Sequence, residues 1–178
     1  EIVPHQIITR SVRIAPRVNA GRIEADTERD LLKLVVVERH TASGNIGLGL
    51  VHGLGLRRGA IASSVAHDSH NIVAAGVNDP DLYVAIRELE RLGGGLVAVD
   101  AGQVISALPL PLAGLLSDQP LRDVVPQFEA VERAAASLGS PLPAPFATLS
   151  FLALPVIPEL RLTDRGLVDV RQFKLLAS

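Results

Sequence analysis

One segment of the chain carries a helix start, an apolar helical face and a helix stop in succession. Asn78-Asp79-Pro80-Asp81 supplies a capping side chain, a proline for the first helical turn and early acidic groups, all of which suit the free N–H groups of a helix N-terminus. Gly93-Gly94-Gly95 follows, where a left-handed C-cap is required. We therefore expect a helix between Asn78 and Gly93. Its apolar face has helical spacing and comprises Leu82, Ala85, Ile86, Leu89 and Leu92.

Short apolar and β-branched runs surround this helix and predict strands, because Gly, Pro or Asp residues bound them. A second helix is expected from Pro126 to Leu138, with Phe128 on its apolar face and Pro126 tolerated only in its first turn. The proline-rich tail after residue 141 is expected to pack without regular structure for much of its length. The resulting fold class is α+β, a mixed β-sheet with flanking helices in a single compact domain. The expected strands span residues 6–14, 31–38, 60–66, 72–77, 96–99 and 104–108.

Composition allows a buried core and excludes several classes of partner. Hydrophobic residues make up 48% of the 178 residues and charged residues only 20%, enough apolar material for one compact domain. The 17 basic and 19 acidic residues leave a net charge of -2, which predicts no nucleic-acid partner and no attraction to an anionic membrane. One Tyr, four Phe and no Trp leave few rings on which bases could stack.

Cysteine is absent, which removes disulfides, thiolate zinc sites and a cysteine nucleophile and fits a reducing compartment. A cytoplasmic location is therefore expected. The longest apolar runs fall short of the roughly 20 residues that a membrane span requires, and no signal peptide opens the chain. Methionine is also absent and the chain opens directly at Glu1-Ile2-Val3. We expect a cut N-terminus and a function that depends on a partner domain.

The segment from Gly44 to Gly59 carries six glycines between apolar residues. A phosphate-cradling loop is one interpretation, but the Walker spacing and the third glycine of a dinucleotide motif are missing. Bulges or tight backbone packing are favoured. Glu38-Arg39-His40 precedes this segment at an expected strand end. An ion pair is favoured for Glu38, whereas Arg39 and His40 could instead reach an interface.

The polar pentad His67-Asp68-Ser69-His70-Asn71 separates two apolar runs and gathers five hydrogen-bonding side chains. One interpretation is a substrate-contacting or gating loop, since imidazole, carboxylate, hydroxyl and amide groups can jointly bind a polar heterocycle. The other is a self-bonded turn in which Asp68 and Asn71 cap local backbone groups. Residue types alone do not separate these alternatives.

No catalytic residue and no metal site are predicted within this chain. His67 and His70 could share a metal, but a third and fourth ligand would have to come from elsewhere, such as His40 or Glu38. The motifs His-x-His, Gly-x-Ser-x-Gly and His-Glu-x-x-His do not occur.

A series of segments, in order, resembles the C-terminal domain of microbial adenine deaminases, members of the amidohydrolase superfamily. The resemblance covers nearly the whole chain. At a few positions, among them Leu54, Leu116, Ala147 and His52, the residue differs from the one usual in that family, and each difference is compatible with packing. The segments are Glu38-Arg39-His40, Gly44-Asn45-Ile46-Gly47-Leu48-Gly49-Leu50-Val51, Gly53-Leu54-Gly55-Leu56, Gly59-Ala60-Ile61-Ala62-Ser63-Ser64-Val65-Ala66-His67-Asp68-Ser69-His70-Asn71, Gly93-Gly94-Gly95, Leu108-Pro109-Leu110-Pro111-Leu112-Ala113-Gly114-Leu115, Pro145-Phe146, Leu149-Ser150-Phe151-Leu152-Ala153-Leu154-Pro155-Val156-Ile157-Pro158 and Leu162-Thr163-Asp164.

The resemblance implies that residues 1–178 are one domain of a metal-dependent hydrolase that converts adenine to hypoxanthine and ammonia in purine metabolism. In such enzymes a binuclear iron or manganese centre lies in a preceding barrel, which this chain is too short to contain. The domain is expected to pack on its own N-terminal barrel, in a homo-oligomer, with the His67 to Asn71 loop as part of a lid over adenine. A stand-alone binding module and a small hydrolase using the histidine pair are the alternatives.

Overall fold

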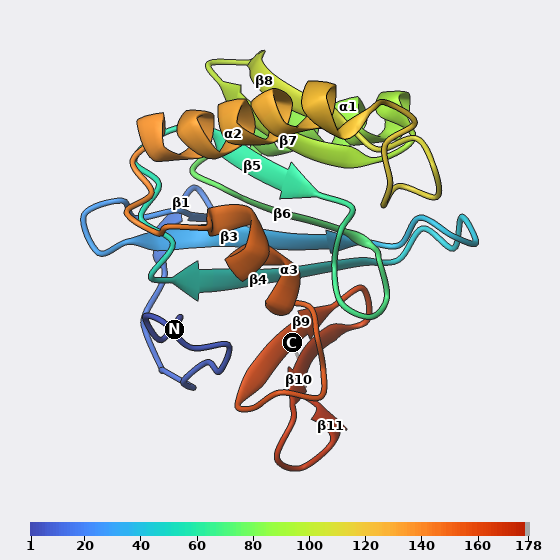
Figure 1. Cartoon of the computed structure of the whole chain (residues 1–178). Coiled ribbons are helices and arrows are strands. Elements are labelled where there is room, and N and C mark those ends of the chain that lie inside the picture. The colour runs from blue at the N-terminus through green and yellow to red at the C-terminus, as the bar shows by residue number, and fades with distance from the viewer. Residues whose placement is uncertain (177–178) are drawn as a thin grey trace.

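The computed structural model describes residues 1–176 and contains a six-stranded sheet in the order β4-β3-β6-β5-β7-β8 (Figure 1). Every neighbouring pair in this sheet is antiparallel. The α+β class is confirmed, but the expected mixed sheet is wrong. β6 and β7 run parallel to each other, and β5 lies between them, so no two parallel strands are neighbours. The strands are β3 (Leu31–Val37), β4 (Ile46–His52), β5 (Ala60–Ser63), β6 (Ile72–Gly76), β7 (Gly95–Asp100) and β8 (Gln103–Pro109).

Helix α1 (Asp79–Leu92) connects β6 to β7 and confirms the expected helix. The Asn78 side chain accepts a hydrogen bond of 2.8 Å from the Asp81 amide, and Gly93 ends the helix in the left-handed region. α1 packs against one face of the sheet, where alanines allow the helix backbone to approach closely. The buried residues of this interface include Leu82, Ala85 and Leu89 of the helix and Ala60, Ala62, Ala74, Val97 and Val99 of the sheet.

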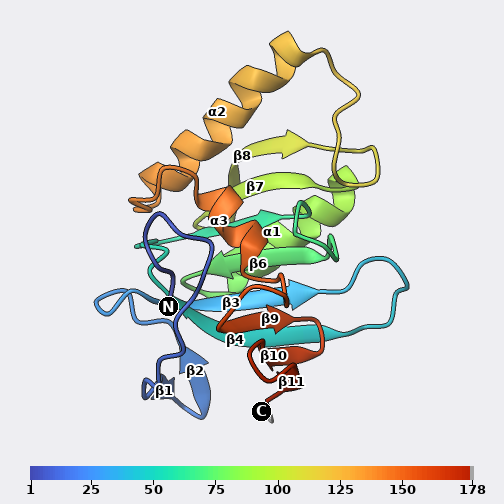
Figure 2. The ribbon, with the colours of Figure 1, turned by 60° about the horizontal axis from the view of Figure 1, so that its bottom comes forward.

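The opposite face of the sheet carries the larger core and two helices, α2 (Leu121–Ser137) and α3 (Pro145–Phe151). A three-stranded sheet of β9 (Leu160–Thr163), β10 (Gly166–Asp169) and β11 (Lys174–Leu175) lies beside β4. Figure 2 shows α3 and the β9–β10 hairpin in front of the sheet and α1 behind it. No helix among residues 1–176 is both long enough and apolar enough to cross a membrane.

Glycines in β4 permit another segment to pack closely against the strand, as the sequence analysis expected. A Cβ atom at Gly47 would lie 1.8 Å from the carbonyl oxygen of Thr163, and one at Gly49 would touch the Leu162 side chain. The β9–β10 hairpin can therefore rest directly on the β4 backbone. The interpretation as a phosphate-cradling loop is not supported, because residues 46–52 form a regular strand paired with β3 along its length and the amides of Gly53 and Gly55 donate to the Asp30 carboxylate.

The strand expected at residues 6–14 is wrong. Only an isolated bridge forms there, between Ile2 and Thr9, and the Thr9 backbone pairs instead with Pro158 and Glu159. A short exposed hairpin follows, made of β1 (Arg17–Asn19) and β2 (Arg22–Glu24). The apolar residues of 6–14 are largely exposed because no strand of the main sheet pairs with this segment.

Two expectations for the C-terminal half hold only in part: the second helix is present and ends at Ser137, but its expected start is wrong, and the tail contains more regular structure than expected. α2 begins at Leu121, so Pro126 lies inside the helix. Proline has no amide hydrogen, so the carbonyl of Arg122, four residues earlier, receives no helical hydrogen bond from it. Arg122 is exposed. Phe128 is 45% exposed and does not reach the core. The tail has regular structure after all, because Pro145 begins α3 as a first-turn residue and the later prolines precede β9.

Replacing the α1 cap tests this description. We expect Asn78→Ala to lower the free energy of unfolding by about 1 kcal/mol, since the Asp81 amide loses its acceptor. Urea denaturation followed by circular dichroism measures the change. Asn78→Ser keeps a capping oxygen and should retain most of the stability; equal losses in both variants would contradict a capping role.

Candidate functional site

Four connecting segments meet at one end of the six-stranded sheet, which we call the polar end. Antiparallel pairing dictates this meeting, because Val37 lies opposite Ile72, and Gly95 lies opposite Pro109. The β3–β4 loop, the β5–β6 loop, the segment after β8 and the β9–β10 turn all emerge there, at the right of Figure 1. Residues far apart in sequence are therefore brought close to the pentad that the sequence singled out.

The β5–β6 loop presents the five predicted site residues at different depths. Asp68 and Ser69 are exposed, His67 and His70 are half-buried, and Asn71 is buried. The five side chains do not all converge on one another. Within residues 1–176 the Asp68 carboxylate accepts no hydrogen bond, so the capping role considered for it in a self-bonded turn is absent.

Arg39 and His40 hold the backbone of this loop from behind. The Arg39 guanidinium donates from Nε to the His70 carbonyl and from Nη2 to the Ala113 carbonyl, both at 2.6 Å. His40 Nε2 lies 2.7 Å from the Ser69 carbonyl oxygen. Two successive carbonyls of the loop are thus bound by side chains that follow β3, while the Asp68 and Ser69 side chains remain exposed.

Glu38 organises the turn that carries these two residues. Its carboxylate accepts hydrogen bonds from the amides of His40, Thr41 and Ser43 and from the hydroxyls of Thr41 and Ser43. The Ser43 amide is the main cause that lowers the Glu38 pKa to about 2. The ion pair that the sequence analysis favoured for Glu38 is wrong, because its carboxylate oxygens accept hydrogen bonds from backbone amides and hydroxyls instead.

Small residues shape the floor beneath Arg39. A Cβ atom at Gly114 would lie 2.6 Å from Arg39 Nη2, so the guanidinium would have to shift if residue 114 carried a side chain. The buried Ser64 hydroxyl donates to the Gly114 carbonyl at 2.6 Å and accepts from the Gly95 amide at 2.7 Å. Burial against this floor lowers the Arg39 pKa below its ordinary value. The segment after β8 is thereby fixed to both β5 and β7.

Asn71 connects the loop to the C-terminal sheet. Its amide group donates to Asp164 at 3.3 Å, and Asn45 donates to the other oxygen of the same carboxylate at 3.2 Å. Two buried atoms beside this bridge, His70 Nδ1 and Asn71 Oδ1, have no hydrogen-bond partner among the described residues. Because buried polar atoms are usually paired, these two atoms are exceptions at the polar end.

The remaining histidines lie apart from the polar end. His52 lies 3.3 Å from the Glu1 carboxylate, and His5 lines a separate pocket. Across residues 1–176 no three His, Cys, Asp or Glu side chains are grouped to hold a metal ion. The site therefore offers hydrogen bonding and charge rather than a ligand set for a metal.

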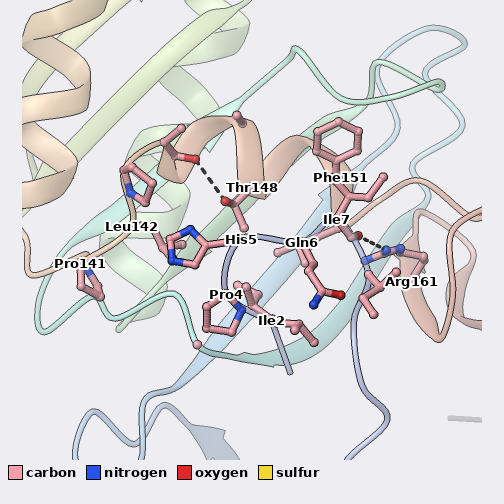
Figure 3. Close-up of a pocket in the computed structure, with 17 residues that line it drawn as sticks. Ile2, Pro4, His5, Gln6, Ile7, Pro141, Leu142, Thr148, Phe151 and Arg161 are labelled. Atoms are coloured by element: carbon pink, nitrogen blue, oxygen red, sulfur yellow. Dashed lines mark hydrogen bonds between the residues drawn. The ribbon is translucent and has the colours of Figure 1, made fainter.

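A pocket of about 430 Å³ lies between residues 2–8 and α3 (Figure 3). Its lining is mostly apolar. Arg161 contributes a buried guanidinium that donates to the Ile7 carbonyl at 2.5 Å, and burial lowers the Arg161 pKa to about 10. Phe151 links the pocket to the polar end, since its ring centre lies 4.8 Å from that of His67.

Sequence reasoning identified the pentad but missed the residues that support it. Ser64, Gly114 and Asp164 occur in quoted segments without a recognised role. Phe151 carried no signal beyond its apolar character. Arg39 and His40 were considered as residues that could reach an interface, and the structure places both against the pentad backbone.

Comparisons with known proteins agree on one family. The family described as "Adenine deaminase C-terminal domain" matches residues 6–174. A protein named adenine deaminase from Dehalococcoides mccartyi is 60% identical over 176 residues, covering 99% of this chain and 31% of its own length. One from Methanothrix thermoacetophila is 57% identical over 172 residues, covering 97% and 30%. The chain thus spans about a third of the curated relatives it matches.

Protonation of Glu38 provides a test of the polar end. A carboxyl whose folded pKa is depressed stabilises the fold above its unfolded pKa and loses that contribution as pH falls. We therefore expect the melting temperature to fall between pH 4.5 and about 2 partly through Glu38, so that Glu38→Gln shows a shallower fall over this range. Differential scanning calorimetry measures both. Glu28→Gln, at an exposed position, is the control and should follow the parent chain.

Proposed function

This chain belongs to the adenine deaminase C-terminal domain family, and we propose that its 178 residues form the C-terminal domain of an adenine deaminase that hydrolyses adenine to hypoxanthine and ammonia. The observation that carries the proposal is the family match over residues 6–174. Relatives named adenine deaminase support it, since their identity of 57–60% extends over almost the whole chain.

The hydrolytic machinery is proposed to lie in the part of the enzyme that precedes this domain. The relatives extend well beyond the matched third of their length, which leaves room for an amidohydrolase barrel. A binuclear iron or manganese centre there would activate the water that attacks C6 of adenine. No group of three potential ligands occurs within residues 1–176, so no step of this chemistry is assigned to the domain itself.

The domain's own contribution is proposed to be a lid formed by His67, Asp68, Ser69, His70 and Asn71 at the active-site mouth. Support comes from the arrangement of the loop, whose Ser69 and His70 carbonyls are bound from behind while Asp68 and Ser69 remain exposed. A loop with a restrained backbone loses little entropy when its side chains engage a ligand. Carboxylate, hydroxyl and imidazole groups complement the amino group and ring nitrogens of adenine.

Packing against the barrel would make the polar end one wall of a pocket between domains, a common location for ligand sites. The buried, unpartnered atoms His70 Nδ1 and Asn71 Oδ1 support this orientation, because a shift of the loop against the barrel or a substrate would let them gain hydrogen-bond partners. The enzyme is proposed to be a cytoplasmic homo-oligomer that acts in purine metabolism. The absence of cysteine fits a reducing compartment.

Activity of the separate parts tests the division of labour. We expect the 178-residue chain alone to leave adenine unchanged and the full-length protein to release ammonia in a coupled assay. Adenine hydrolysis by the purified 178-residue chain, abolished by a metal chelator, would refute the proposal.

Substitutions in the loop test the lid. In the full-length protein, Asp68→Asn and His70→Ala are expected to lower kcat/KM by about tenfold or more, the loss of one hydrogen bond to a charged or polar group. Metal content, measured by elemental analysis, should not change. Arg122→Ala, on an exposed part of α2, is the control. Parent-like kinetics in both loop variants would remove the lid from the proposal.

A further inference from the structure

The two edge strands of the six-stranded sheet differ in the features that block pairing with another strand. β8 has a shift of register opposite Ala98 and Val99 and ends in Pro109. β4 at the other edge pairs with β3 in one uninterrupted register, and its sequence contains no proline and no Asp, Glu, Lys or Arg. Because bulges, prolines and charges are the usual means of blocking an open edge, β4 lacks the features that prevent another strand from pairing with it.

The direction of the backbone groups in β4 can be read from its ends. The Asn45 carbonyl accepts from the Glu38 amide, so it points toward β3, whereas the His52 carbonyl accepts from Ile2 and points away. Successive residues of an antiparallel strand alternate in direction. The amides and carbonyls of Ile46, Leu48 and Leu50 therefore point outward, and within residues 1–176 no hydrogen bond satisfies them.

Apolar side chains and hollows flank this edge on both faces. Leu48 is 73% exposed and Ile46 is 56% exposed. A hollow of about 460 Å³ on the α1 side is lined by Leu48, Val35 and Ile23. A hollow of about 260 Å³ on the opposite side is lined by Leu162, Leu167, Val12 and Ile14, among others. A strand added to an edge directs alternate side chains to the two faces, so both hollows would receive side chains from it.

We propose that the free edge of β4 pairs with an extended segment of the polypeptide that precedes this domain in the full-length enzyme. The inference rests on the proposed function. The length of the relatives favours this occupant, since about two thirds of each lies outside the matched region. So does the path of the chain, because the Ile2 amide bonds to the His52 carbonyl at 2.8 Å. Polypeptide preceding Glu1 therefore starts beside the β4 edge.

Such pairing would anchor the domain on its partner and orient the polar end. The added strand would lie roughly 4.8 Å from β4 and carry apolar side chains on both faces. The β9–β10 hairpin rests on the face of β4 at Gly47 and Gly49, and Leu48 remains exposed at the edge. The backbone supplies the affinity in this mode of recognition, and the hollows supply the selectivity.

Hydrogen exchange resolved to single residues tests the pairing. The amides of Ile46, Leu48 and Leu50 should exchange in the 178-residue chain and slow by about tenfold or more in the full-length protein. The amides of Gly47 and Gly49, directed toward β3, are the internal control and should be protected in both. Equal exchange of the three outward amides in both proteins would overturn the proposal. Protection in the 178-residue chain that rises with its concentration would overturn it in favour of a second copy.

A substitution at the β4 edge provides a second test of the pairing, made on the full-length protein alone. Leu48→Lys places a charge at the edge and should restore fast exchange at Ile46 and Leu50, whereas Leu121→Lys, at a position 76% exposed on α2, should leave their protection intact. Retained protection in the Leu48 variant would also overturn the proposal. Adenine hydrolysis is measured separately on the parent full-length protein, so that a failure of the proposed function is distinguished from a failure of this inference.

Discussion

Close approach of backbones is the constraint on which this structure depends. Alanines of the central strands let α1 lie near one face of the sheet, and Gly47 lets the β9–β10 hairpin rest on the other. A single added methyl group at Gly47 would overlap the Thr163 carbonyl. The chain can therefore enclose its core with few aromatic side chains, because small residues bring the layers together instead of large ones filling the gap between them.

The same principle operates at the polar end, where Gly114 leaves room for the Arg39 guanidinium. A half-buried cation that binds only carbonyl groups carries a desolvation cost, which its two short hydrogen bonds offset. The result is a pentad whose backbone is fixed by residues from another loop. This division suits a recognition loop, since the supporting groups and the presented groups are different residues.

The path of the chain connects the proposed function with the open β4 edge. In our proposal the family match makes the domain part of a longer enzyme. The open β4 edge is the surface to which the preceding polypeptide of that enzyme would bind. The edge and the polar end lie on one rigid sheet, so the position of one determines the position of the other. Attachment through β4 would thus place the His67 to Asn71 loop at a defined point relative to the barrel.

Local signals in the sequence determined the elements whose ends they mark. Asn78 and Gly93 located α1, and the polar pentad located the β5–β6 loop, because caps and turns act over a few neighbouring residues. The ordered motifs also determined the family. Signals that depend on distant partners were misleading: residues 6–14 have the composition of a strand, but no edge of the main sheet pairs with them.

The pairing of strands and the contacts of the site depend on how distant segments pack in three dimensions. The position of β5 between β6 and β7 made the sheet antiparallel, and no local pattern encodes that choice. Arg39 and His70 are 31 residues apart, and Asn71 and Asp164 are 93 apart. Such contacts follow from how the strands are ordered, so residue types and spacing identified the groups that could act, and the fold selected which of them meet.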